Sequence, residues 1–505
     1  MRPSMERRRD DPRFGANPVN DPGATIALSL ISHTNAGKTT LARTLLARDV
    51  GEVRDAPHVT TEATAYPLIE TDRGDVLMLW DTPGFGDSAR LARRLAQEGN
   101  PIGWFLTQVW DRWRDRPFWL TQLAVRNVRD HADVILYLVN AAEDPGDAGY
   151  LAPELAVLAW MGKPVLVLLN QTGPPRAPED EAQDVARWRA ALTAHAHVRD
   201  VLVLDAFARC WVQEFALFAA IETTLPPDRR PPFARLAAAW RARRWAQFDA
   251  AIAALAQPVA AAICARAVVP PKPMLRRLGT ALGVRGDAAD DDMRRALRAL
   301  AEPLDADMRD AMERVIALYE LSGRAIGDVE ARVAEDLARE GPVGEAKAAA
   351  VGGIVSGAVT GLAADLAAGG LTFGAGMLAG ALLGALGGAG VARALNVVRG
   401  QSDDAVRWDD AFLERLVVSV LLRYLAVAHY GRGRGDYRDG EYPAFWRPRV
   451  EAAVAARRTA FAGVFALRGQ AAEVAPTAEA LTPLLAETAR AVLAELYPAA
   501  FAAGA

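Results

Sequence analysis

One stretch near the start of the chain constrains the fold more than any other. An apolar, partly β-branched run from Thr25 to Ile31 suits a buried parallel strand. The loop from Ser32 to Thr39 then reads S-H-T-N-A-G-K-T, and apolar residues recur at helical spacing from Thr40 to Ala47. The loop approaches the pattern G-x-x-x-x-G-K-[S/T], whose backbone N–H groups cradle phosphate oxygens ahead of a helix. The order strand, loop, helix therefore predicts an α/β domain that binds phosphate.

The residues of this loop have separable tasks. We expect Lys38 to reach the β- and γ-phosphates, Thr39 to bind Mg²⁺ through its hydroxyl, and Gly37 to let the backbone approach the anion. Ser32 stands where the pattern has glycine. If that position needs a positive φ, serine costs about 1 kcal/mol, which phosphate binding can offset.

A second element fits the same chemistry. The run from Val76 to Asp81 is apolar and ends in a carboxylate, and T-P-G follows, ending at Gly84. We expect Asp81 to hold Mg²⁺ through water, and Gly84 to place its N–H on a γ-phosphate and release it after hydrolysis. An ordinary strand-to-turn D-x-P-G is the alternative. The presence of Lys38 and Thr39 in the first loop favours the phosphate site.

The segment between these elements contains V-T-T-E-A-T, from Val59 to Thr64. A threonine here can supply a hydroxyl or carbonyl to Mg²⁺ and close over the γ-phosphate, which makes it both a metal ligand and part of the catalytic set. Thr61 is the first choice and Thr60 the second. A solvated loop ahead of a strand at residues 65–69 is the alternative.

Together these motifs resemble the Era and TrmE branch of the translation-factor-like GTPases, which carry G-x-x-N-x-G-K-[S/T] and D-T-P-G. The resemblance implies binding of GTP and GDP, Mg²⁺-dependent hydrolysis, and a catalytic set of Lys38, Thr61 and Gly84. Nucleotide contacts are then expected at Asn35, Ala36, Gly37, Lys38, Thr39 and Thr40. Asn35 matches the asparagine that in this group can help bind a monovalent cation, so K⁺-stimulated hydrolysis is expected. Phe85 replaces the water-orienting glutamine of Ras-like enzymes, which implies slow turnover.

Recognition of the base departs from the family pattern. The chain reads N-Q-T-G from Asn170 to Gly173, where the family has N-K-x-D. Asn170 fits, but the aspartate that reads guanine is absent, and losing such a contact can cost orders of magnitude in discrimination. The preference for guanine is implied by the resemblance alone, and a preference for adenine is the alternative. The run from Val201 to Ala206 resembles the last strand before the base loop, with Ala206 equivalent to the alanine of the S-A-K motif.

At 505 residues the chain is too long for one core. The predicted fold class is an α/β P-loop GTPase domain with a mostly parallel sheet, followed by an all-α domain with a hydrophobic glycine-zipper hairpin. This combination looks like a bacterial family that joins an Era-like GTPase domain to a C-terminal domain of unknown function. The expected parts are a disordered tail (1–23), an Era-like G domain (24–225), a helical region (226–345), the hydrophobic hairpin (346–400) and a C-terminal helical region (401–505).

Within the second half, apolar residues at three- and four-residue intervals predict helices over residues 233–255, 291–301 and 306–337, with a linker at 268–273. The hairpin is predicted from glycines four residues apart in the Ala/Gly/Leu/Val run 348–395, a spacing that lets helices approach closely. Each of its two arms is long enough to cross a bilayer. Asp365 would cost about 2 to 3 kcal/mol at mid-membrane, so packing among soluble helices is the alternative.

Net charge and cysteine number limit which partners and which cell compartment we expect. A net charge of -4 gives no nucleic-acid signature of the basic kind. Cys210 and Cys264 are too few for a disulfide framework, which favours the cytoplasm, with peripheral or inserted contact at the inner membrane also open. Membrane surface, protein partner and homo-oligomer all stay open. Two alternative functions also stay open: a nucleotide-binding scaffold with negligible hydrolysis, and a membrane-active structural protein gated by its N-terminal domain.

A tryptophan-rich insertion precedes the strand expected near residues 131–139. Trp104, Trp110, Trp113 and Trp119 have approximate helical spacing, which predicts an amphipathic helix. Such a helix either contacts a membrane interface or partner, or packs on its own domain.

Overall fold

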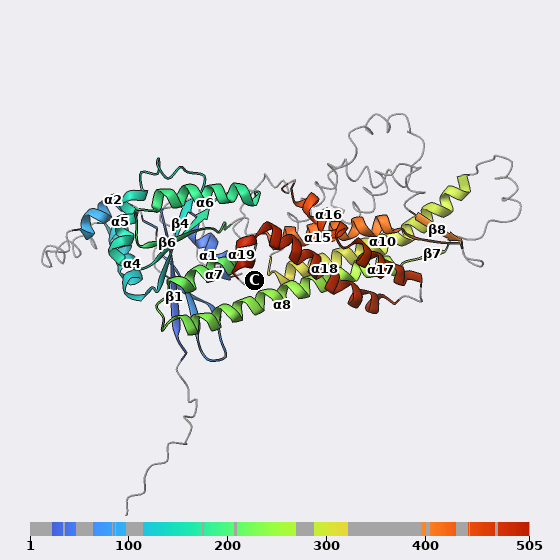
Figure 1. The fold of residues 1–505 in the computed structure, drawn as a ribbon, viewed down its shortest axis with the longest axis horizontal. Helices are drawn as coiled ribbons and strands as arrows, with labels where there is room; N and C mark the ends of the chain where they lie inside the picture. Colours follow the sequence, from blue (N-terminus) through green and yellow to red (C-terminus); the bar gives the residue numbers. More distant parts are fainter. Residues whose placement is uncertain are drawn as a thin grey trace, which may run out of the picture.

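The structure is a computed structural model with two parts, an α/β part and an elongated helical part (Figure 1). It describes residues 23–33, 36–46, 64–82, 84–85, 87–96, 115–173, 176–206, 210–268, 287–321, 395–399, 404–430, 443, 445–469 and 473–503. The predictions for the N-terminal tail, Asn35, Thr60, Thr61 and nearly all of the glycine-zipper hairpin lie outside these residues. The same is true of Trp104, Trp110 and Trp113.

A six-stranded sheet lies at the centre of the α/β part, in the order β2-β3-β1-β4-β5-β6. Its strands are β1 (Thr25–Ser32), β2 (Thr64–Glu70), β3 (Val76–Asp81), β4 (Val134–Asn140), β5 (Val165–Asn170) and β6 (Val198–Val203). Only the β2–β3 pair is antiparallel among these six strands. The prediction of a mostly parallel sheet is confirmed. The central strands are continuous apolar runs because helices bury both of their faces.

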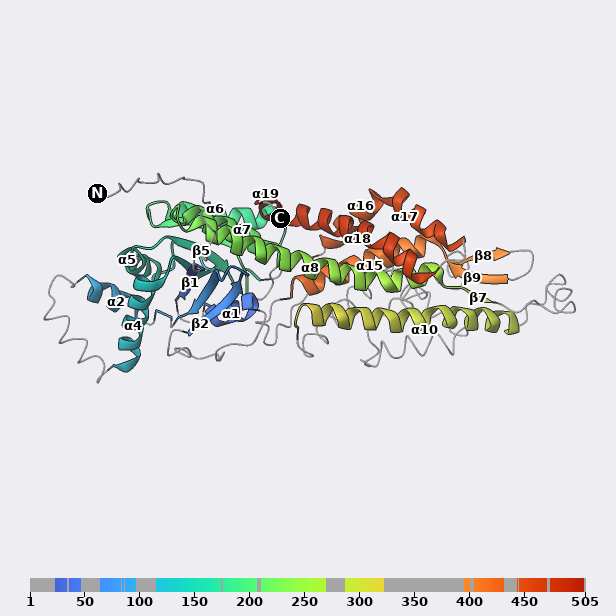
Figure 2. The same cartoon turned by 90° about the horizontal axis from the view of Figure 1, so that it is seen from below.

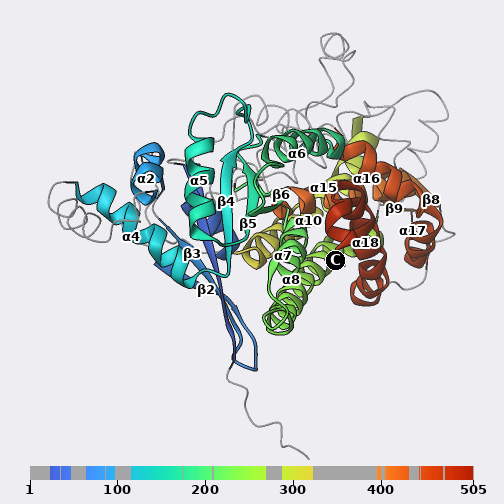
Figure 3. The same ribbon diagram turned by 60° about the vertical axis from the view of Figure 1, so that its left-hand side comes forward.

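Helices cover the two faces of this sheet, as Figure 3 shows. One face packs on α2 (Ser88–Leu95), α4 (Arg116–His131), α5 (Leu151–Met161) and α6 (Pro178–Leu192). The other face packs on α1 (Lys38–Leu46), α7 (Gln213–Thr224) and α8 (Arg230–Cys264). Trp119 lies in α4, so part of the predicted tryptophan-rich helix is present on this domain.

The helical part is built along α8, whose 35 residues correspond to about 52 Å. Figure 2 shows α8 running from the sheet past the other helices. These are α10 (Asp287–Leu318), α15 (Asp410–Ala428), α16 (Trp446–Ala455), α17 (Arg458–Phe465), the 3-10 turn η1 (Ala466–Gly469), α18 (Val474–Leu496) and α19 (Pro498–Ala502). α8 packs against α10, α15 and α18.

The start of α8 is fixed to the sheet by ion pairs. Arg235 donates from Nε to Asp75 Oδ2 over 2.7 Å and from Nη2 to Asp75 Oδ1 over 2.9 Å. This guanidinium lowers the pKa of Asp75 to about 2, although burial opposes the shift. Arg229 Nη2 lies 2.8 Å from Asp133 Oδ1, and Asp133 Oδ2 accepts from Ala27 N of β1. Both pairs lie at the amino ends of the strands.

The prediction that the second half is all-helical is wrong in one place. Strands β7 (Ala267–Val268), β9 (Asp404–Trp408) and β8 (Leu395–Arg399) form an antiparallel sheet in the order β7-β9-β8. The second residue of β7, Val268, is the first residue of the predicted linker (268–273). β8 lies at the end of the predicted hydrophobic hairpin (346–400). The β-branched and aromatic residues of these short runs have high strand propensity. β8 and β9 are close in the sequence, whereas β7 pairs with β9 across more than a hundred residues.

The two helices predicted over 291–301 and 306–337 are also corrected. A single helix, α10, spans Asp287–Leu318 with Pro303 inside it. Proline removes one backbone hydrogen bond, but burial of Leu300, Leu304 and Met308 along one stripe holds the helix together across it.

Among the described residues, α8 is long and apolar enough to cross a membrane, judged by length and composition alone. In its most apolar window, 56% is buried inside the molecule, as expected of a core helix.

One hydrophobic core joins the two parts. Leu41 and Leu45 of α1, facing the sheet, belong to the same cluster of buried residues as the core of the helical part. At the junction, Trp211 Nε1 donates to the Tyr424 hydroxyl over 3.0 Å. Trp211 also packs edge-on against Trp245 of α8, with 5.0 Å between ring centroids. The chain just after β6 is therefore anchored to α8 and α15.

Candidate nucleotide site

The phosphate-binding loop leaves the carboxyl end of β1. Gly37 has a φ of +84°, which favours glycine, and α1 begins at Lys38. Ser32 continues β1 with an ordinary negative φ, so the strain considered for serine at this position is absent. The Ser32 hydroxyl instead accepts a 2.8 Å hydrogen bond from Lys38 Nζ.

Lys38 is almost fully buried, with 7% of its surface exposed. Burial lowers the pKa of the Lys38 ammonium, while the carboxylates of Asp81 and Glu154 act in the opposite direction. A buried ammonium is a strong point charge for an anionic ligand, because little water screens it.

The end of β3 places a carboxylate beside this loop, as predicted. Thr39 Oγ1 donates to Asp81 Oδ2 over 2.7 Å. Asp81 Oδ1 is buried without a hydrogen-bond partner. Burial raises the pKa of Asp81, opposed by the Thr39 hydrogen bond and the Lys38 charge. A buried, unsatisfied carboxylate oxygen next to a threonine hydroxyl fits Mg²⁺, which takes few protein ligands when phosphates supply the others.

Within the described part of the chain, no group of three or more His, Cys, Asp and Glu residues could hold a metal by itself. Of the three predicted metal ligands, the structure describes Thr39 and Asp81, while Thr61 lies outside the described residues. Gly84 lies just after β3. Its neighbour Phe85 donates its backbone N–H to Ser32 O over 3.0 Å, and its side chain is 1% exposed. A buried phenyl ring cannot orient an attacking water.

Asn170 at the end of β5 connects the phosphate loop to the base loop. Its Nδ2 donates to Ala36 O over 2.7 Å, and its Oδ1 accepts from Ala206 N over 2.8 Å. A Cβ added at Gly37 would lie 2.7 Å from Asn170 Nδ2, so the two loops are in close contact. Thr44 Oγ1 of α1 also donates to Ala206 O over 3.0 Å. The predicted residues Ala36, Gly37, Asn170 and Ala206 are thus brought together.

A buried cluster beside the loop was not predicted. Glu154 of α5 is fully buried and accepts from Tyr137 OH over 2.6 Å, and His33 Nδ1 lies 2.6 Å from its other oxygen. Tyr150 stacks on the His33 ring at 4.4 Å. Burial raises the pKa of Glu154, opposed by its bonds to His33 and Tyr137. The available signal was one glutamate in the apolar sequence of α5.

A carboxylate at the base end of the site was also missed. Asp205, just after β6, is 2% exposed. Its Oδ2 accepts from Thr172 N over 2.6 Å and from Thr172 Oγ1 over 2.8 Å. Gly173, where the family pattern has aspartate, has a φ of +83°, and the space that a Cβ would occupy there is open. The signal was an aspartate at the end of an apolar strand.

Glu181, at the start of α6, gives this end of the site a pH dependence. Burial, together with the charges of Asp205 and Asp184, raises the pKa of Glu181 to about 7, while Arg176 opposes the shift. The folded protein thus prefers protonated Glu181. Its stabilising contribution is complete below the unfolded pKa, about 4.5, and is lost as pH rises through about 7.

Replacing Glu181 with glutamine should therefore raise the melting temperature more at about pH 8 than at about pH 5, because only the ionised form is penalised. Thermal unfolding of Glu181→Gln and wild type at both pH values measures this. Glu179→Gln, an exposed change on the same helical turn, is the matched control. A gain equal at both pH values would contradict the assigned pKa.

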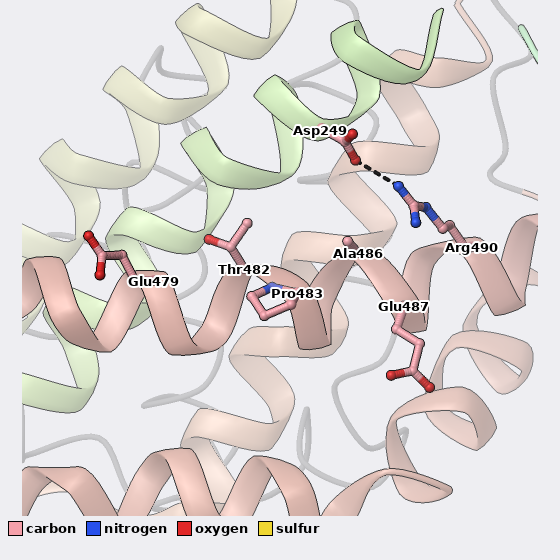
Figure 4. A pocket seen from close by; sticks show the side chains of 7 residues that line it. All are labelled: Asp249, Glu479, Thr482, Pro483, Ala486, Glu487 and Arg490. Atoms are coloured by element: carbon pink, nitrogen blue, oxygen red, sulfur yellow. Dashed lines mark hydrogen bonds and ion pairs between the residues drawn. The ribbon is translucent and has the colours of Figure 1, made fainter. Parts of the chain in front are cut away.

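A separate pocket of about 580 Å³ opens on the helical part, far from the phosphate loop (Figure 4). Thr482, Pro483 and Ala486 of α18 form its floor, and Arg490 pairs with Asp249 of α8 over 2.9 Å at its edge. Its charged side chains are exposed and of both signs. Nothing in this lining resembles a phosphate site.

The parallel sheet, the glycine loop and the paired Thr39 and Asp81 define a P-loop GTPase domain. Residues 28–171 match the family model described as 50S ribosome-binding GTPase. Residues 189–471, more than half of the chain, match the model described as a domain of unknown function, DUF3482. The chain belongs to the DUF3482 family, with a P-loop GTPase domain at its N-terminal side.

The GTPases Der and Era are each similar to part of this chain. GTPase Der of Mycobacterium tuberculosis (strain ATCC 25177 / H37Ra) is 26% identical over 176 residues, which are 34% of this chain and 31% of Der. The chain thus spans about a third of the curated relatives it matches. A structure of Aquifex aeolicus Era bound to GDP and AlF4⁻ shows 17% identity and a TM-score of 0.27, covering 40% of this chain and 57% of Era. Era in complex with MgGDPNP and 16S ribosomal RNA nucleotides shows 17% identity and a TM-score of 0.26, covering 41% and 58%.

Proposed function

We propose that this protein is a nucleotide switch that binds GTP, hydrolyses it to GDP and phosphate, and passes its nucleotide state to the helical part. The observation that carries the proposal is the bridge made by Asn170 between Ala36 O and Ala206 N. Because this side chain fixes the spacing between the phosphate loop and the base loop, one ligand bearing both phosphates and a base fits the site. The family match over residues 28–171 supports the same reaction.

The residues then have defined roles. Gly37 lets backbone N–H groups approach the phosphates, and Lys38 places its charge against the β- and γ-phosphate oxygens. Thr39 and Asp81 would hold Mg²⁺, which when bound neutralises charge on the phosphate oxygens. Phe85, the residue after Gly84, is buried, and its phenyl ring cannot position water as the glutamine of Ras-like enzymes does. Turnover is therefore slow, and K⁺ held near Asn35 is the proposed accelerator.

The route to the helical part begins at the base loop. Ala206 is held by Asn170, and five residues later Trp211 donates to Tyr424 of α15. Tyr424 in turn lies 3.0 Å from the Tyr319 hydroxyl, at the end of α10. A change in the base loop on nucleotide binding would therefore act directly on α10 and α15.

The test is titration of the full chain with fluorescent GTP and ATP analogues in Mg²⁺, followed by phosphate release in K⁺ and in Na⁺. We expect GTP-selective binding and slow phosphate release that K⁺ accelerates. Binding without phosphate release would instead indicate a nucleotide-binding scaffold. Binding of neither nucleotide would overturn the proposal.

For location, we propose the cytoplasm, since two cysteines, Cys210 and Cys264, are too few for a disulfide framework. Contact with the inner membrane through residues 348–395 is the proposed mode of any membrane association, with a protein partner or a second copy as the other effectors of the helical part. Liposome flotation with and without nucleotide tests the membrane contact. Equal flotation after deletion of residues 348–395 would exclude that segment as the anchor.

A further inference from the structure

The N-Q-T-G segment lacks the family's carboxylate at Gly173, yet the structure places a carboxylate at the same loop from another strand. Asp205 reaches across from the end of β6 and accepts two hydrogen bonds from Thr172, through the backbone N and through Oγ1. Both donors bind the same oxygen, Oδ2, so they fix the orientation of the carboxylate. Thr172 therefore acts as a positioning residue for Asp205.

Asp205 also has the right place along the site. The phosphate loop lies at the carboxyl end of β1, and ligands of open α/β sheets bind outside the carboxyl ends of the strands. From there the nucleoside extends past β4 toward the ends of β5 and β6. Asp205 stands there, one residue before Ala206, whose N–H is held by Asn170.

Guanine and a carboxylate match chemically. The guanine edge presents its N1–H and N2–H₂ donors side by side, and an ionised carboxylate only accepts hydrogen bonds. Adenine presents an acceptor at N1, which a carboxylate repels. In a buried site such charge-assisted hydrogen bonds are strong.

We propose that Asp205 is the specificity-determining carboxylate of this protein, reading the guanine base from β6 in place of the missing residue at position 173. The inference rests on the proposed GTP-binding function. Gly173 supports it, because the open space and the absent side chain there leave room for a carboxylate that comes from the neighbouring strand.

The test is calorimetric titration of the full chain with GDP, xanthosine diphosphate and ADP. Asp205→Asn should weaken GDP binding by at least about tenfold and strengthen xanthosine diphosphate binding, because the amide offers one acceptor for N1–H and one donor for the C2 carbonyl of xanthine. Asp200→Asn, on the same strand and paired with Arg189, should leave the order of affinities unchanged. A residue that only supports the loop would lower all affinities together, without a gain for xanthosine diphosphate.

An unchanged ratio of GDP to xanthosine diphosphate affinity in Asp205→Asn overturns the proposal, as does equal binding of GDP and ADP by wild type. If Asp205→Asn does not fold, Thr172→Val takes its place, since it removes one bond to the carboxylate and keeps the charge. It should lower the GDP preference several-fold, and an unchanged ratio there also overturns the proposal. Failure of wild type to bind any of the nucleotides would overturn the proposed function instead.

Discussion

Replacing Lys38 with methionine should lower the affinity for GTP by about tenfold to a hundredfold, and phosphate release should fall with it. The expected loss follows from the removal of hydrogen bonds to a charged group, each worth about 1.5 to 3 kcal/mol. Methionine keeps the aliphatic stem of Lys38 but removes the ammonium. Titration with a fluorescent GTP analogue in Mg²⁺ measures the change.

The same substitution leaves the buried carboxylates of Asp81 and Glu154 without a nearby cation, so the melting temperature of the unliganded variant is measured alongside the titration. Binding and folding are thereby separated in one variant. Lys163→Met, a lysine of the same domain after α5, is the matched control and should bind GTP like wild type. Wild-type affinity in Lys38→Met would remove this residue from the phosphate site.

Replacing Arg244 with alanine should cost about 3 to 5 kcal/mol of unfolding free energy, because it leaves a buried charge without its partner. Arg244 donates to both oxygens of Glu214 over 2.9 Å, and the two side chains are 6% and 0% exposed. Trp240 Nε1 donates to the same carboxylate, at 2.5 Å. Denaturant unfolding of full-length wild type and variant measures the loss.

Arg243→Ala is the control, because its ion pair with Glu320 is half exposed and 3.5 Å long, and it should cost less than about 1 kcal/mol. The double variant Arg244→Met, Glu214→Gln should recover most of the stability, since neither charge is then left alone. A loss in Arg244→Ala no larger than that of Arg243→Ala would show that Glu214 finds other compensation.

Sequence reasoning located the parts of the site whose signals are local. The strand before Ser32 and the strand that ends at Asp81 were predicted from short apolar runs, and the structure contains both. It also joins Thr39 to Asp81 by a hydrogen bond. Asn170 and Ala206 were also predicted, and they bond to each other. Such predictions succeed because parallel strands bring their carboxyl ends to one edge. The roles of these residues toward nucleotide and Mg²⁺ stay predictions, as do those of Thr61 and Asn35.

The parts that sequence reasoning missed depend on contacts between distant segments. Glu154 meets His33 across 121 residues, and no periodicity in either segment indicates that pair. β7 pairs with β9 across more than a hundred residues, so the local sequence of each strand alone does not indicate a strand. Two helices were predicted over residues 291–301 and 306–337, whereas packing of the apolar stripe keeps α10 continuous through Pro303.

The shared core has a consequence for where this chain can be divided. Trp211, Phe215 and Phe218 face Trp240, Trp245 and Phe248 of α8, and they belong to the same cluster as the side chains beneath the sheet. The chain thus changes from α/β to helical architecture near residue 225, but the two parts are not independently folding domains. A fragment that ends there would expose these aromatic side chains to water, so the GTPase part is expected to aggregate when it is produced alone. The helical part therefore contributes to the folding of the GTPase part.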